Sequence, residues 1–85
     1  MGADGQGIGP MKRYASAAGD SGVAAYECGP DSITIRFQHG GTYRYDGRHP
    51  GSEHVIEMQR LAEAGVGLNT YINQYVREDY AARLD

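Results

Sequence analysis

Residues 33–45 read ITIRFQHGGTYRY, and this stretch decides the fold that the sequence predicts. Apolar and polar residues alternate over 33–37 and again over 42–45, and two adjacent glycines stand between the two runs. Alternation with a period of two is typical of half-buried strands, and a glycine-bearing turn between them predicts a β-hairpin. Aromatic residues and arginines are interleaved here, which suits either a ligand-binding surface or a well-packed sheet. The pattern therefore says more about the fold than about the function.

Further strands are expected beside this hairpin. Val23–Cys28 is expected to form a first strand that ends at the turn-forming residues Gly29–Ser32. Ile33–Gln38 and Gly41–Asp46 are the second and third strands. Because the connections are short, neighbouring strands must be antiparallel.

Two helices are expected after the strands. Ser52–Ala64 carries apolar residues at intervals of three and four, and the glycines at 65 and 67 end this pattern. Asn69 or Thr70 can cap a second helix. Its apolar stripe consists of Ile72, Tyr75, Val76, Tyr80 and Leu84. The predicted fold class is α+β, a three-stranded antiparallel β-meander followed by two α-helices packed on one face of the sheet.

Length and composition indicate one small domain. The chain has 85 residues, of which 40% are hydrophobic and 22% are charged. Residues 1–15 are expected to form a flexible tail, because the glycine-rich start offers little apolar surface to offset the backbone entropy of ordering. Residues 16–85 are expected to form the α+β domain.

The sequence does not have the features of a strongly basic, a disulfide-bonded or a membrane-spanning protein. The formal net charge is −3, so binding to nucleic acid requires a local basic patch. A single cysteine, Cys28, allows no intrachain disulfide and favours a reducing compartment. No apolar run approaches the roughly 20 residues that span a bilayer, and no signal-peptide pattern is present. We therefore expect a cytoplasmic protein that does not enter membranes.

The length of the central turn decides where the tyrosines point. A two-residue turn at 39–40 would place Tyr43 opposite Arg36 and put both Tyr43 and Tyr45 on the polar face. A three-residue turn with a bulge glycine pairs odd positions with odd positions, and buries both tyrosines beside the apolar residues of the preceding strand. We favour the three-residue turn, because only this register keeps the apolar residues on one face.

The first hairpin gives a similar expectation for Cys28. Either a two-residue or a four-residue loop places Cys28 opposite Ile33 and Tyr26 opposite Ile35. Cys28 is then expected to be a buried small hydrophobic residue and not a nucleophile.

Buried tyrosines leave a polar face on the other side of the sheet. This face is expected to carry Thr34, Arg36, Gln38, Thr42 and Arg44, with Arg48 just beyond. Like charges across a ladder repel by roughly 0.2–1 kcal/mol, which a wet surface can tolerate. The alternative is an anion site, because guanidinium groups suit phosphate and carboxylate.

The segment Val23–Leu84 resembles the KTSC domain, a short module at the C-terminus of some lysyl-tRNA synthetases that also occurs as stand-alone bacterial proteins. The residues that carry this resemblance are Tyr26, Phe37, the Y-x-Y motif Tyr43-Arg44-Tyr45, Pro50, Gly65, Asn69 and Ile72. The chain departs from the family where an aromatic pair usually precedes the asparagine, since Gly67 and Leu68 stand there. The family has no established activity, and the attachment to a synthetase implies RNA binding.

Two binding functions follow from these patterns. The first is binding of RNA, such as tRNA, through Arg36, Arg44 and Arg48, with Tyr43 or Tyr45 stacking on bases if exposed. The second is a protein-interaction module, in which a partner strand adds to the edge of the first strand.

Catalysis is not expected, and neither is a cofactor. The only set of possible metal ligands is formed by His39, His49, His54, Glu53 and Glu57. These residues lack the paired spacing of a zinc site, so we interpret them as surface residues.

Overall fold

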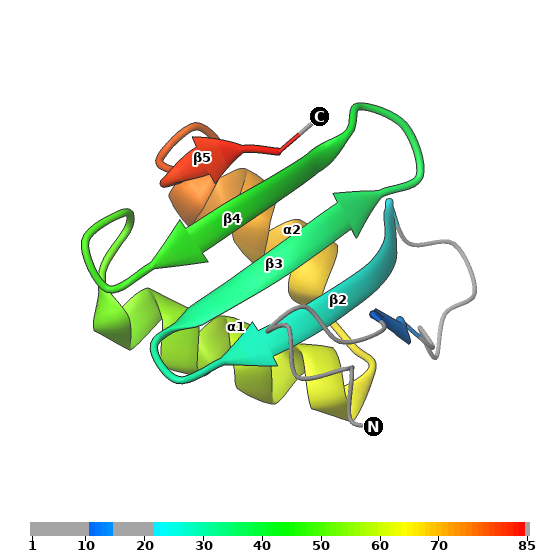
Figure 1. The fold of residues 1–85 in the computed structure, drawn as a ribbon. Coiled ribbons are helices and arrows are strands. Elements are labelled where there is room, and N and C mark those ends of the chain that lie inside the picture. Colours follow the sequence, from blue (N-terminus) through cyan, green and yellow to red (C-terminus); the bar gives the residue numbers. More distant parts are fainter. Residues whose placement is uncertain (1–10, 15–21, 85) are drawn as a thin grey trace, which may run out of the picture.

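The hairpin of residues 33–45 forms the centre of a five-stranded antiparallel sheet in the computed structural model, which describes residues 11–14 and 22–84 (Figure 1). The strands lie side by side in chain order. They are β1 (Lys12–Arg13), β2 (Val23–Gly29), β3 (Ser32–Phe37), β4 (Thr42–Asp46) and β5 (Ala82–Arg83). The predicted α+β class is confirmed, but the expected three strands are fewer than the five observed.

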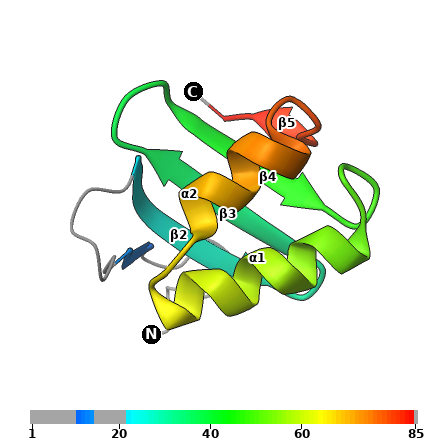
Figure 2. The ribbon, with the colours of Figure 1, turned by 180° about the vertical axis from the view of Figure 1, so that it is seen from behind.

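The helices cover one face of this sheet and leave the other face without a helix (Figures 1 and 2). They are α1 (Ser52–Ala64), α2 (Leu68–Tyr71) and η2 (Ile72–Val76), a π-helical turn that continues directly from α2. Helix α1 ends at Gly65, which has a left-handed φ of 75° and donates its N–H to the carbonyl oxygen of Leu61 at 2.9 Å. None of the described helices is long and apolar enough to cross a membrane.

The hydrophobic core lies between the sheet and the helices. Its members are Tyr14, Val23, Tyr26, Ile33, Ile35, Tyr45, Val55, Met58, Ala62, Leu68, Ile72 and Val76. Strand β3 contributes Ile33 and Ile35, which are both fully buried because they alternate with polar residues on the pleated strand. The arginine-bearing face of the same strand therefore points away from the helices.

The register of the central hairpin agrees with the three-residue turn. Ile33 pairs with Tyr45 and Ile35 pairs with Tyr43, so odd positions face odd positions. The turn closes where the N–H of Phe37 donates to the carbonyl oxygen of Gly41 at 3.0 Å. Gly40 and Gly41 have φ values of 110° and 99°, which side chains other than glycine rarely adopt.

The first hairpin has the expected pairs but a different environment for its cysteine. Tyr26 lies opposite Ile35 and Cys28 lies opposite Ile33, as predicted. Cys28 is nevertheless exposed, so the expectation of a buried cysteine is wrong. It stands near the end of β2, where a small hollow also lined by Lys12 and Glu63 reaches the thiol.

Strand β1 corrects the expected boundary of the tail. Lys12 and Arg13 pair with Tyr26 and Ala25 of β2, although the sequence placed them in a flexible segment over 1–15. The next residue, Tyr14, is only 6% exposed, and its phenol oxygen accepts the N–H of Leu68 at 3.2 Å. This buried ring anchors the segment to the core. The remainder of the expected tail, 1–10 and 15, lies outside the described residues.

The second helix is shorter than predicted. Its helical residues end at Val76, and the chain then turns back so that β5 pairs with β4. Tyr80 therefore packs beside Tyr45 from a loop, with ring centroids 6.5 Å apart, and not from a helical stripe. The predicted stripe also included Tyr75 and Leu84. These side chains are 61% and 53% exposed, so neither of them is part of the core.

Candidate functional site

The helix-free side of the sheet, which we call the open face, carries the arginines that the sequence singled out. Alternation along β3 and β4 places Thr34, Arg36, Thr42 and Arg44 on this face, and both arginine side chains are exposed. Arg36 pairs with Thr42 and Arg44 pairs with Thr34, so the two arginines are diagonal neighbours. A pair of guanidinium groups thus faces outward with hydroxyl side chains between them.

Strand β1 adds a third arginine that sequence reasoning missed. Arg13 pairs with Ala25, and Ala25 pairs in turn with Arg36, so these residues form one row across the sheet. Residues paired across an antiparallel ladder share a face, which puts Arg13 on the open face as well. A two-residue strand has no detectable periodicity, and only the adjacent Tyr14, an aromatic residue after a glycine-rich stretch, could have pointed to it.

The open face is hollowed, and the hollow connects Arg44 to Arg48. A depression of about 620 Å³ lies over the open face. Its lining includes Glu27, Cys28, Thr34, Thr42 and Arg44, with Met11 and Leu84 from the outer segments. A second depression of about 470 Å³ shares Arg44 and reaches Arg48 in the loop after β4. Asp31 and Asp46 also line this second depression, whereas Arg36 lines neither of the two.

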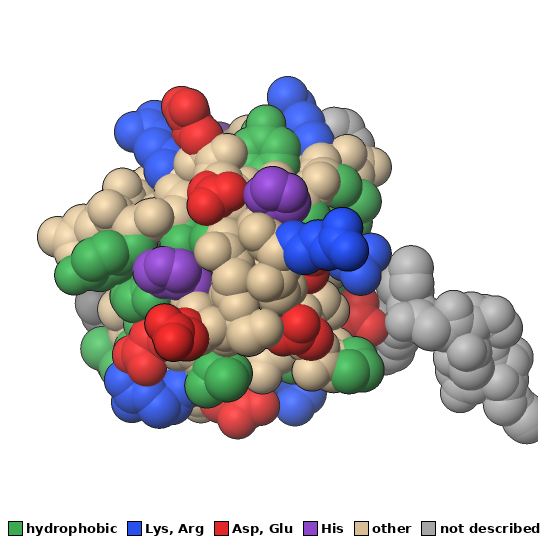
Figure 3. Space-filling model, turned by 90° about the vertical axis from the view of Figure 1, so that its left-hand side faces the viewer, with side chains coloured by type: hydrophobic (Ala, Val, Ile, Leu, Met, Phe, Trp, Pro, Cys, Tyr) green, Lys and Arg blue, Asp and Glu red, His purple; other side chains and the backbone are tan. Residues whose placement is uncertain are grey.

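Side chains of both charge signs lie on the open face. Glu27 pairs with Thr34 and Asp46 pairs with Ser32, so two carboxylates share the open face with the arginines. Asp46 limits the basic surface at one end. Its carboxylate accepts the N–H groups of Arg48 and His49 at 2.9 and 3.0 Å, and these hydrogen bonds lower the pKa of Asp46. Acidic and basic side chains are mixed at the end of the sheet where β4 leads into α1 (Figure 3).

The tyrosines of the predicted site lie on the opposite face. Tyr45 is 1% exposed, and burial raises the pKa of its phenol to about 12, so its ring is not available for stacking. Tyr43 is half-buried, and its ring contacts those of Phe37 and Tyr80 at centroid distances of 5.8 and 4.6 Å. The guanidinium carbon of Arg83 lies 5.6 Å from the Tyr43 centroid. The open face and the aromatic rings are therefore two separate features.

The sheet edges are partly occupied by short strands. On β2, the N–H of Tyr14 donates to the carbonyl oxygen of Ala24 at 3.0 Å, and β1 continues this pairing. On β4, the N–H groups of Ala81 and Leu84 donate to the carbonyl oxygens of Arg44 and Thr42 at 2.7 and 2.8 Å. The expected free edge at the first strand is therefore wrong at Ala24–Tyr26.

The histidines have separate partners. His54 Nδ1 lies 2.7 Å from the phenol oxygen of Tyr71, and His49 Nδ1 lies 3.4 Å from a carboxylate oxygen of Asp79. A search of residues 11–14 and 22–84 found no group of three or more side chains placed to hold a metal ion.

Comparisons with family models, with curated proteins and with solved structures found no match to the chain. The resemblance to the KTSC domain stays a prediction from the sequence.

Proposed function

We propose that the protein is a non-catalytic module that binds the sugar–phosphate backbone of single-stranded RNA on its open face. The observation that carries this proposal is that strand pairing places Arg13, Arg36 and Arg44 on the open face. Arg48, in the loop after β4, lines a depression that Arg44 also lines. Guanidinium groups bind phosphate oxygens through paired N–H donors.

The ligand is the backbone and not the bases, because the open face offers no stacking platform. The paired open-face positions of the described strands carry arginine, threonine, alanine, serine and acidic side chains, and no aromatic ring. Threonine and serine hydroxyls hydrogen-bond to phosphate oxygens in nucleic-acid complexes. Binding should therefore depend strongly on salt and weakly on sequence. The resemblance to the KTSC domain supports RNA as the polyanion.

The protein-interaction alternative has less support from the geometry. A partner strand along Ala24–Tyr26 would have to displace β1, whose neighbour Tyr14 is buried in the core. The arginines of the open face need no such rearrangement to meet a ligand.

A fluorescence anisotropy titration with a labelled single-stranded RNA of about 12 nucleotides tests the proposal. With four phosphate contacts, the logarithm of the binding constant should fall against the logarithm of the salt concentration with a slope near −2.8. Raising the salt concentration from about 50 to 200 mM should therefore weaken binding roughly 50-fold. Arg36→Gln and Arg44→Gln should each weaken binding and reduce the steepness of the slope by about 0.7.

Arg60→Gln is the matched control, because Arg60 is an exposed arginine on α1 that pairs with Glu57. It should leave the titration unchanged. The absence of binding at low salt, or an equal loss with Arg60→Gln, would contradict the proposal.

A further inference from the structure

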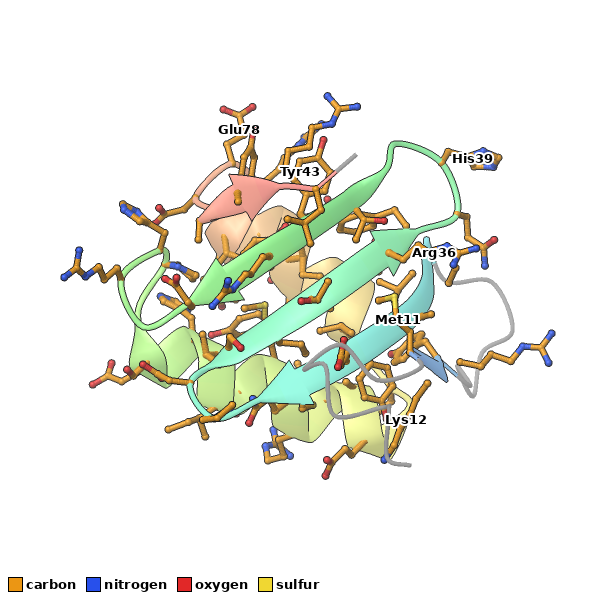
Figure 4. All side chains as sticks on the ribbon, viewed as in Figure 1. Met11, Lys12, Arg36, His39, Tyr43 and Glu78 are labelled. Atoms are coloured by element: carbon orange, nitrogen blue, oxygen red, sulfur yellow. The ribbon has the colours of Figure 1, made fainter. Side chains whose placement is uncertain are left out.

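We propose a second binding site, on the helix face, for a planar aromatic ligand that carries a phosphate, such as a nucleoside 5′-monophosphate. The site is a groove of about 480 Å³ between η2 and the end of the β3–β4 hairpin. This inference goes beyond the proposed function, because the groove contains none of the open-face arginines. In Figure 4, Tyr43 lies between His39 at the hairpin tip and Glu78 beside β5, and these three residues all line the groove.

The groove is lined by aromatic rings that are already fixed in place. Phe37, Tyr43 and Tyr80 all line it, and each of them is half-buried. The rings of Phe37 and Tyr43 meet at an interplanar angle of 69°, and those of Tyr43 and Tyr80 meet at 57°. Because the rings pack against one another, a flat ligand would contact side chains that are already ordered.

Polar side chains of both charge signs line the same groove. Arg77 and His39 can donate hydrogen bonds to a phosphate, and Arg77 carries a permanent positive charge. Asn73 offers both a donor and an acceptor, and the Glu78 carboxylate accepts, which are the kinds of hydrogen bond that a nucleobase edge can complete. A ligand with an anionic end and a hydrogen-bonding flat end satisfies this distribution.

The π-helical turn η2 forms one wall of the groove. Ile72 and Asn73 of η2 both line the groove, and Arg77 follows the last residue of the turn. Ile72 is 2% exposed, whereas Asn73 and Arg77 are exposed. The turn therefore buries the side chain of Ile72 and leaves those of Asn73 and Arg77 accessible at the groove. Single π-helical turns occur frequently at functional sites. The volume also falls in the range typical of small-ligand sites.

A two-dimensional ¹H–¹⁵N NMR titration with 5′-AMP and 5′-UMP tests this inference. Nucleotide concentrations up to about 5 mM are used, because this range covers millimolar dissociation constants. The signals of Gly40, Asn73 and Arg77 should shift with saturation. Adenosine, which lacks the phosphate, and ribose 5-phosphate, which lacks the base, should each bind at least about tenfold more weakly.

Arg77→Gln should raise the dissociation constant about tenfold, and Arg60→Gln should leave it unchanged. Arg77 is exposed, so its variant should retain the dispersed spectrum of the folded chain. The inference is overturned if no signal shifts, or if ribose 5-phosphate binds as tightly as the nucleotides. Shifts confined to Thr34, Arg36 and Arg44 would also overturn it, while leaving the open-face proposal intact.

Discussion

Arg44 and Tyr45 are neighbours in sequence, yet their side chains face opposite sides of the sheet. Tyr45 is 1% exposed in the core, and Arg44 is exposed on the open face. The reason is the odd-numbered turn, which pairs Ile33 with Tyr45 and Thr34 with Arg44. This part of the site was predictable from sequence, because only one register keeps the apolar residues on one face.

The burial of Tyr45 predicts a loss of stability at alkaline pH. Burial raises the pKa of its phenol in the folded protein to about 12, from an ordinary value of 10.0, so the unfolded phenol loses its proton first as the pH rises. Between these two values the free energy of unfolding should therefore fall by about 1.4 kcal/mol per pH unit from this group. Tyr45→Phe should remove this part of the loss, as measured by urea denaturation at a series of pH values from 8 upward.

Tyr75→Phe is the control for this measurement, because Tyr75 is 61% exposed. The Tyr75→Phe variant should lose as much free energy of unfolding at alkaline pH as the unmodified protein does. An unchanged alkaline loss in Tyr45→Phe would show that the phenol of Tyr45 is not buried as described.

At the scale of elements, the sequence predicts the long periodic strands and helices but not the short ones. Strands β2, β3 and β4 and helix α1 each show a repeated pattern of apolar residues. Strands β1 and β5 have two residues each, and a pair of residues shows no period. Their positions depend on side chains that pack at a distance in sequence, Tyr14 for β1 and Tyr80 for β5.

The end of the second helix shows a related ambiguity. Ile72, Val76 and Tyr80 are spaced by four residues, which fits a continuous helix. The same three residues also reach the core when the helix stops at Val76 and Tyr80 returns to pack against Tyr43 and Tyr45. Spacing alone cannot separate these two arrangements.

Substitution of Tyr14 tests whether β1 belongs to the folded domain. Tyr14→Ala should destabilise the protein by about 3–5 kcal/mol, because it removes a buried ring that packs edge-on against Tyr26. Tyr14→Phe should cost only about 1 kcal/mol, because it loses the acceptor for the Leu68 N–H but keeps the ring. Urea denaturation monitored by circular dichroism measures both changes.

Arg13→Ala serves as the neighbouring control, since this side chain is exposed and should change stability little. If all three variants unfold at the same urea concentration, β1 does not contribute to the fold.

At the scale of the whole molecule, the uneven distribution of charge matters more than the net charge of −3. Arginines from β1, β3 and β4 share the open face with Glu27 and Asp46, while Glu53, Glu57 and Glu63 lie on α1 behind the sheet. Two of these arginines were predictable from strand alternation. Arg13 was not, because its place on this face depends on β1. The aromatic groove was not predictable either, since its walls come from distant parts of the chain.

The most direct test of the open-face proposal is to observe the arginine side chains themselves. In a ¹H–¹⁵N spectrum with single-stranded RNA, the side-chain Nε–Hε signals of Arg13, Arg36, Arg44 and Arg48 should shift, and that of Arg60 should not. The account predicts that these shifts disappear together when salt is raised. Shifts confined to Arg60 and the backbone of α1, or no shifts at low salt, would contradict it.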